Sequence, residues 1–170
     1  MPEPMTLGEM LLRAALALLL GGMIGWDRER KEKAAGLRTM MLVSLGSAGV
    51  MMGGMELAAS LSDASFRIDP TRVMSGVIGG IGFLGAGSII QGGRRVHGLT
   101  TAASIWAAAG VGIAAGAGLY RLAFVLAGAV LVALVLVTAL KGTVLPDRHE
   151  VHEKRHHHKD DASIDQDLSD

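Results

Sequence analysis

Five long apolar stretches alternate with clusters of charged residues along this 170-residue chain. An α-helix needs about 20 apolar residues to cross the hydrocarbon core of a bilayer, with a range of ~17–25. Each stretch is about that long, and Arg13 is the only charged residue inside any of them. The pattern predicts an all-α integral membrane protein with five transmembrane helices, over residues 10–26, 39–55, 73–91, 99–120 and 122–140.

Local signals mark where two of these helices begin. Thr6 followed by Glu9 has the spacing of a capping box, in which each side chain bonds the backbone amide of the other residue. Asp69 before Pro70 favours a helix start, because Asp accepts hydrogen bonds from free amides and proline fits the first helical position. We therefore expect the third helix to begin at this pair.

Lys and Arg are unevenly divided between the two sides of the predicted membrane. The loops before the second and fourth helices, together with the C-terminal side, carry twelve of them, whereas the opposite side carries three. Positive residues favour the cytoplasmic side, so we expect the N-terminus outside and the C-terminus in the cytoplasm. Arg13, early in the first helix, is expected to extend outward and pair with Glu9 one turn before it.

Composition separates a transmembrane domain at 1–141 from a charged tail at 142–170. Gly accounts for 24 residues and aromatic residues for only 4%, which suits closely packed apolar helices. The tail holds four Lys/Arg and eight Asp/Glu with few apolar residues, so we expect it to be disordered in the cytoplasm. It also contains candidate metal ligands at helical spacing, which are His149, His152 and His156. The chain has no cysteine, which excludes disulfides and thiolate metal sites.

The third apolar stretch contains the letters G-x-G-x-x-G at 80–85, which also describe a dinucleotide-binding loop. Such a loop needs a preceding strand and an acidic residue about 20 positions later. Here the next acidic residue is Asp147, and the glycines lie in the middle of an apolar stretch. The nucleotide interpretation therefore fails.

Close helix packing is the favoured explanation of these glycines, because small residues let helix backbones approach each other in lipid. Ser75, Gly79, Gly82 and Ala86 share one face, and a second face contains Gly76, Gly80 and Gly87. Two small faces predict two neighbours, so we expect the third helix at the centre of the bundle. The predicted packing residues are Gly76, Gly79, Gly80, Gly82, Gly85 and Gly87. An unwound segment that binds an ion through its backbone is the alternative.

The segments "IGWDRERKEKAAGLRTMMLVSLG", "GIGFLGAG" and "GLTTAASIW" resemble the MgtC/SapB family of bacterial inner-membrane proteins. The resemblance covers roughly residues 9–141, and the short tail is similar to members that lack the family's C-terminal ACT-like domain. It implies five membrane helices and a role in growth under magnesium limitation and, in pathogens, in intracellular survival. For the namesake type it implies modulation of the F-type ATP synthase. Asp27 departs from the family pattern, which usually has Glu there.

Charged and hydroxyl side chains near the ends of the predicted helices are the candidate functional residues. The expected cytoplasmic cluster could hold a phosphate or a lipid headgroup, or could simply anchor the helices; it comprises Asp27, Arg28, Glu29 and Arg38. On the opposite side Asp69 and Arg72 are one turn apart, and Glu56 is a second carboxylate that could share a cation with Asp69. A polar face on the fourth helix, expected to serve packing, comprises Thr100, Thr101 and Ser104.

These features favour a non-enzymatic, multi-pass protein of the bacterial inner membrane, since no pair of His, Asp or Glu lies within any predicted span. We expect membrane lipid around it, a homodimer or a membrane protein as partner, no nucleic acid and no cofactor. The function implied is adaptation to magnesium limitation through a membrane partner such as the F-type ATP synthase. The alternative is a small Mg²⁺ transporter or a channel component, although charges at helix ends and the lack of an inverted repeat speak against it.

Overall fold

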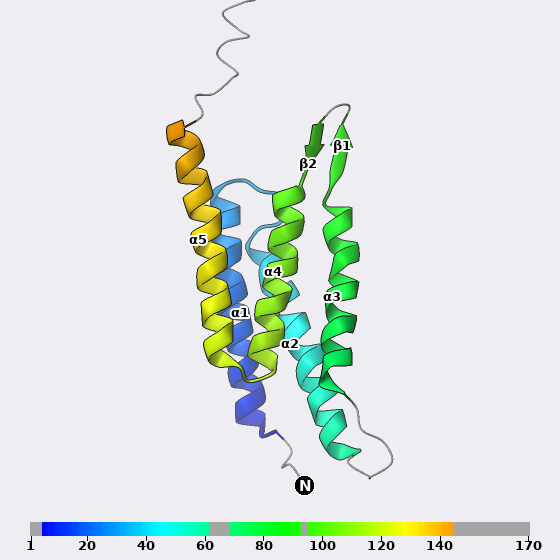
Figure 1. The fold of residues 1–170 in the computed structure, drawn as a ribbon. Helices are drawn as coiled ribbons and strands as arrows, with labels where there is room; N and C mark the ends of the chain where they lie inside the picture. Colours follow the sequence, from blue (N-terminus) through cyan, green and yellow to red (C-terminus); the bar gives the residue numbers. More distant parts are fainter. Residues whose placement is uncertain (1–4, 62–68, 93–94, 145–170) are drawn as a thin grey trace, which may run out of the picture. The chain divides into compact units, whose positions relative to one another are not determined.

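The computed structural model describes residues 5–61, 69–92 and 95–144 (Figure 1). Its elements are α1 Leu7–Arg30, α2 Leu37–Ser60, α3 Pro70–Gly87, β1 Ile90–Gly92, β2 Arg95–His97, α4 Leu99–Gly116 and α5 Tyr120–Val144. The chain divides into two units after Leu134, and the packing described below lies within the first. The metal site predicted at His149, His152 and His156 lies outside the described residues.

The five predicted helices are all present, and both helix-start signals are confirmed. Thr6 and Glu9 form the capping box at α1, and Asp69 caps α3 with Pro70 in its first turn. Three helices, α1, α2 and α4, are long and apolar enough to cross a bilayer. The described apolar part of α5 is shorter, at Tyr120–Leu136. The structure thus supports a membrane protein, and three of the five predicted spans are long and apolar enough to cross a bilayer.

The centre of the described bundle is formed by α4 and α2. Most of α4 is buried, including Ala108 and Val111, and α4 packs against α1, α2 and α3. Glycines make these contacts close: a methyl group on Gly112 would overlap the backbone of Ser44 in α2. Gly21 of α1 likewise lies against the backbone of α2 at Met40. The close packing through small residues that is expected for helices in lipid therefore occurs where α1 and α4 contact α2.

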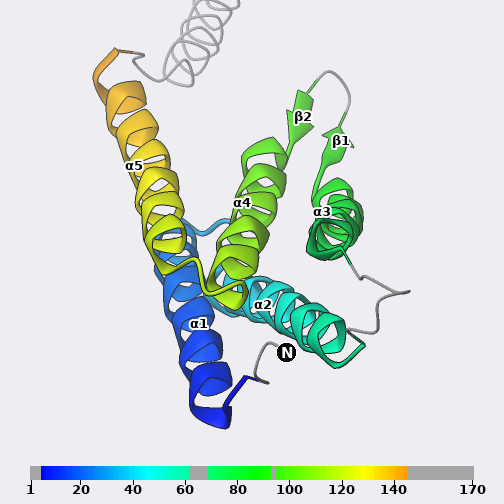
Figure 2. The same cartoon turned by 60° about the horizontal axis from the view of Figure 1, so that its bottom comes forward.

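The prediction that α3 lies at the centre is corrected by the structure. In Figure 2, α3 lies at one side of the first unit, beside α2 and α4. Gly85 is its only buried residue, and a side-chain carbon placed there would lie 3.6 Å from Ala102 of α4. A side-chain carbon at the other five predicted packing glycines would have no atom of a neighbouring element within 4 Å; these are Gly76, Gly79, Gly80, Gly82 and Gly87. The helix is continuous from Pro70 to Gly87, which removes the basis for an unwound ion site.

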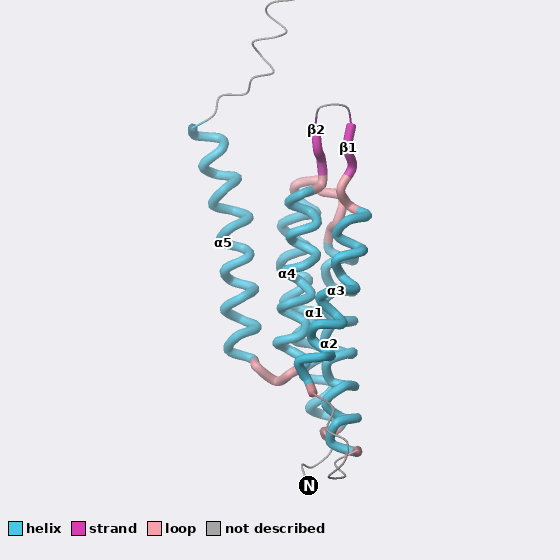
Figure 3. The backbone as a smooth tube through the Cα atoms, turned by 45° about the vertical axis from the view of Figure 1, so that its right-hand side comes forward, coloured by secondary structure: helices cyan, strands magenta, loops and turns pink. Residues whose placement is uncertain are grey.

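A short antiparallel hairpin follows α3 and was not predicted. The third apolar stretch was expected to remain helical to residue 91, but α3 ends at Gly87, where the Ser88 hydroxyl donates to the carbonyl of Gly85 at 2.7 Å. Strands β1 and β2 then pair, with Gln91 opposite Val96. Gly98, with φ of 89°, turns the chain into α4. The hairpin and the α1–α2 loop lie at the same end of the bundle (Figure 3).

Candidate functional site

Arg28 is the only charged side chain among the described residues that is fully buried. It lies in the last turn of α1, is 3% exposed, and donates a hydrogen bond from Nη2 to Oγ1 of Thr101 at 2.6 Å. Its Nε is also buried and has no hydrogen-bond partner among the described residues. A buried charge usually needs an opposite charge or several hydrogen bonds. Arg28 has a single side-chain hydrogen bond, to a neutral hydroxyl, and the opposite charge that acts on it is that of Asp27, its neighbour in sequence.

The position of Thr101 makes this pairing electrostatically unusual. Thr101 is the third residue of α4, whose N-cap is Gly98 and whose first turn has no side-chain cap. The free amides of a helix N-terminus carry a partial positive charge. The Arg28 guanidinium therefore places a full positive charge at the N-terminal end of α4, and the partial positive charge at that end repels cations. An anion at this point would interact favourably with both.

The nearest acidic residues in sequence make their ion pairs and hydrogen bonds with other groups. Asp27 forms an ion pair with Lys31 at 2.8 Å on the same helix. Glu29 accepts a hydrogen bond from the backbone amide of Leu37 at 2.6 Å, and it thereby caps α2, whose own N-cap Gly36 has no side chain to do so. Two members of the predicted cluster, Asp27 and Glu29, therefore make separate structural contacts.

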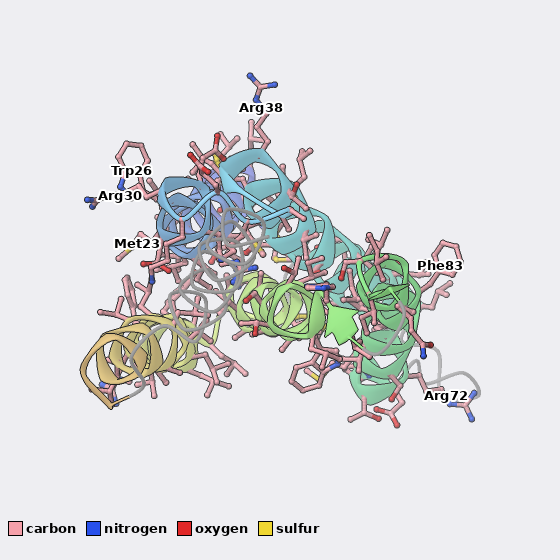
Figure 4. All side chains as sticks on the ribbon, turned by 90° about the horizontal axis from the view of Figure 1, so that it is seen from above. Met23, Trp26, Arg30, Arg38, Arg72 and Phe83 are labelled. Atoms are coloured by element: carbon pink, nitrogen blue, oxygen red, sulfur yellow. The ribbon has the colours of Figure 1, made fainter. Side chains whose placement is uncertain are left out.

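Arg38 does not join that cluster. It is exposed in the first turn of α2, and viewed along the bundle it extends away from the helices, as Arg30 does (Figure 4). The sequence placed Arg28 and Arg38 in one group because both flank apolar stretches. The structure separates a buried arginine from a solvent- or headgroup-facing one.

Arg13 has a role that the sequence did not reveal. Its charge acts on Glu9 as expected, and its side chain also donates from Nη1 to the carbonyl of Gly116 at 2.9 Å, at the last turn of α4. Cations stabilise helix C-termini because the free carbonyls there carry partial negative charge. The two ends of α4 thus each meet an arginine of α1, and the helix dipole favours a positive charge only at the Arg13 end.

The opposite candidate cluster is not assembled into a metal site among the described residues. Asp69 is exposed and accepts from the amide of Thr71 at 2.9 Å, while Glu56 accepts from the amide of Met5 at 3.1 Å. The bond from Thr71 lowers the pKa of the Asp69 carboxyl, and the positive charge of Arg72 lowers it further. Arg72 itself points away from the bundle (Figure 4). No group of three or more metal-binding side chains occurs within the described ranges.

The predicted polar face of α4 consists of two different contacts. Ser104 donates to the carbonyl of Thr100 in its own helix at 2.7 Å, whereas Thr101 accepts the bond from Arg28. Thr101 and Ser104 are buried and Thr100 is exposed. The packing role expected for hydroxyls in membrane helices therefore fits Ser104, and Thr101 belongs to the Arg28 site.

Two apolar pockets lie between α2 and α3. One, of about 370 Å³, lies at the hairpin end and includes Phe83, Ser88 and Thr101 in its wall. The other, of about 490 Å³, lies farther along the same helices and is lined by Gly46 of α2 and by Gly76 and Gly80 of α3, among others. Both pockets share Val43 and Leu84. Gly76 and Gly80 of α3 therefore border a groove instead of a helix contact.

The fold and this site define a helical membrane protein with an arginine buried at the N-terminus of an internal helix. Residues 14–143 match the model of the MgtC family, so the chain belongs to that family. This confirms the resemblance inferred from the sequence motifs.

Individual relatives agree with this assignment. A protein of Escherichia coli K12 described as "Putative magnesium transporter YhiD" is 40% identical over 129 residues, which cover 75% of this chain and 59% of that protein. "Protein MgtC" of Salmonella typhimurium LT2 is 37% identical over 105 residues, covering 62% of this chain and 42% of that protein. The chain thus spans about half the length of these relatives. No solved structure matches it.

Proposed function

We propose that this protein supports bacterial adaptation to magnesium limitation by acting on a membrane protein partner, for which the F-type ATP synthase is the first candidate. In this proposal it is a non-enzymatic, multi-pass protein of the inner membrane, with its N-terminus outside and its C-terminus in the cytoplasm. Membership of the MgtC family and the magnesium-related name of a relative support the magnesium connection.

The outward face of α3 is the observation that favours a protein partner. Ser75, Gly79, Gly82 and Ala86 lie on this face, and all four are exposed. A side-chain carbon at Gly79 or Gly82 would meet no neighbouring element within 4 Å. Small residues on a membrane helix permit close approach of another helix, and here no helix of the described chain occupies that face.

Cation transport is the second candidate, and the name of the Escherichia coli relative favours it. A transport path for Mg²⁺ is expected to present oxygen ligands, commonly carboxylates with several waters. The fully buried charge in the described bundle is instead the cation Arg28. That charge would repel Mg²⁺, so the regulatory role is the stronger proposal.

Site-specific photo-crosslinking in magnesium-starved cells tests the partner directly. A photoreactive residue at Ala86 is expected to form adducts with a subunit of the F-type ATP synthase. The comparison position is Leu122 on α5, which is 46% exposed and is followed one turn later by the large residues Val125 and Leu126. Adducts at Ala86 with a second copy of the chain alone, or the same adducts at both positions, would contradict the proposal.

A transport assay distinguishes the second candidate. The purified protein is placed in vesicles that contain a magnesium-sensitive dye, and Mg²⁺ is added outside. We expect no entry above that of protein-free vesicles. Entry that depends on the protein would favour the transporter.

A further inference from the structure

We propose that the groove between α2 and α3 binds an anionic phospholipid, whose phosphate lies against Arg28 and the N-terminus of α4 and whose acyl chain follows the groove. This binding site is separate from the partner-facing side of α3, and its test needs no partner protein.

The first support is the burial and sparse hydrogen bonding of Arg28. Its guanidinium is buried, its Nε has no partner among the described residues, and its one hydrogen bond goes to the neutral hydroxyl of Thr101. The carboxylate of Asp27 acts on Arg28 through its charge alone, because its ion pair is with Lys31. Such a charge is stable only with further polar contacts or an opposite charge.

The second support is the end of α4 at which this charge lies. Anions bind at helix N-termini because several free amides point toward them and the helix dipole favours negative charge. The first turn of α4 is uncapped by side chains. A phosphate there would accept hydrogen bonds from both the guanidinium and the free amides, and it would relieve the repulsion between them.

The third support is the apolar groove that begins at the same place. Thr101, the partner of Arg28, is also in the wall of the pocket nearest the hairpin. The adjoining pocket continues between α2 and α3, and Val43 and Leu84 belong to both. Arg28 itself is not among the lining residues, so a bound molecule would approach its guanidinium where Thr101 forms the wall, and would place an apolar chain along the helices.

Glycines keep the groove open along its length. Gly46 of α2 and Gly76 and Gly80 of α3 line the pocket farther from the hairpin, and a side-chain carbon at any of them would meet no neighbouring element within 4 Å. Larger residues at these positions would fill the space. A free phosphate would satisfy Arg28 and leave this apolar space without an occupant, which is why the groove favours a phospholipid.

The experiment measures lipid binding to the purified full-length protein in mild detergent by native mass spectrometry. The probes are phosphatidylglycerol, phosphatidylcholine and inorganic phosphate. The unchanged protein is expected to retain phosphatidylglycerol in preference to phosphatidylcholine. Arg28→Gln should lower the affinity for phosphatidylglycerol by at least about tenfold, the size expected for losing a charge-assisted hydrogen bond.

Two pairs of variants keep the outcome clear. Arg38→Gln removes an exposed arginine at the same end and is expected to bind normally. Gly80→Leu should fill the groove and lower lipid affinity while leaving Arg28 in place, whereas Gly79→Leu on the outward face should not. Because Gly80 borders open space, this variant should fold even if Arg28→Gln does not.

Three results would overturn the proposal. Equal retention of phosphatidylglycerol by the unchanged protein and by Gly80→Leu would show that the groove is not the site. Equal loss from Arg38→Gln and Arg28→Gln would indicate nonspecific surface charge. Binding of inorganic phosphate that displaces the lipid and persists in Gly80→Leu would show a free-phosphate site instead.

Discussion

Arg13 of α1 donates a hydrogen bond to the carbonyl of Gly116 at the C-terminal end of α4, 103 positions later in the chain. The contact ties the first helix to the central helix at the end opposite Arg28. A charged donor on free helix carbonyls is among the stronger hydrogen bonds in proteins.

Replacing Arg13 with Gln is therefore expected to destabilise the bundle by about 1–3 kcal/mol. The measurement is the thermal unfolding of the purified protein in detergent. Arg30→Gln is the control, because Arg30 is exposed at the other end of the same helix. Equal unfolding temperatures for the two variants would show that the Gly116 contact contributes little.

Gly112 should be far less tolerant of substitution than Gly110, two residues earlier in α4. A methyl group on Gly112 would overlap the Ser44 backbone, whereas one on Gly110 would meet no neighbouring element within 4 Å. We expect Gly112→Ala to cost about 1–3 kcal/mol through overpacking. Gly110→Ala should be neutral or stabilise by up to about 1 kcal/mol through helix propensity. The same unfolding assay compares them, and a reversed order would refute the close α2–α4 contact.

Local features of this fold could be predicted from the sequence, and contacts between helices could not. The caps at Thr6 and Asp69 depend on residues within one turn, so their spacing alone indicates them. The partners of Arg28 and Arg13 are 73 and 103 positions away, and their meeting depends on how whole helices are aligned. No short motif encodes that alignment.

The error about α3 has a specific physical cause. Glycine at regular spacing shows that a helix face is small, but it does not show what lies opposite. In α4 the small face at Gly112 meets the backbone of α2, whereas in α3 the face at Gly80 borders a groove and the one at Gly82 is open. Of the six packing glycines predicted in α3, only Gly85 faces another helix, and the closest glycine contacts are made by α1 and α4.

Glu29 is predicted to hold the start of α2 in place of an N-cap side chain. Glu29→Ala removes the acceptor for the Leu37 amide and should destabilise the protein by about 0.5–2 kcal/mol, the range for lost helix caps. Glu29→Gln keeps an oxygen acceptor of the same reach and should retain most of the stability. If both variants lost the same amount of stability relative to the unchanged protein, the negative charge and not the hydrogen bond would be the stabilising feature.

The proposed orientation rests on the distribution of Lys and Arg, and reporter fusions test it. A reporter fused after Asp170 should be active in the cytoplasm, and one inserted near Ser62 should be active in the periplasm. A periplasmic signal from the C-terminal fusion would contradict five spans with the N-terminus outside.

Substitutions at Asp69, at the start of α3, distinguish a structural role of its carboxylate from a functional one. The hydrogen bond from Thr71 and the positive charge of Arg72 lower the pKa of Asp69 in the folded protein. A lowered folded pKa means that its contribution to stability is present above the unfolded pKa and is lost as the pH falls through the folded value. Asp69→Asn keeps the cap, so it should remove this pH dependence and leave the protein at normal abundance in the membrane.

The growth phenotype of the same variant is the decisive measurement. The carboxylate is exposed and interacts electrostatically with Arg72, which points away from the bundle (Figure 4), so its charge is available to a cation or a partner. We expect Asp69→Asn to fail to restore growth of a deletion strain in low-magnesium medium, because it retains the shape of the side chain and removes its charge. Asp69→Ala, which loses both charge and cap, is the comparison and should also be less abundant. Full rescue by Asp69→Asn would reduce Asp69 to a helix cap, since the hydrogen bond to Thr71 alone would then account for its role.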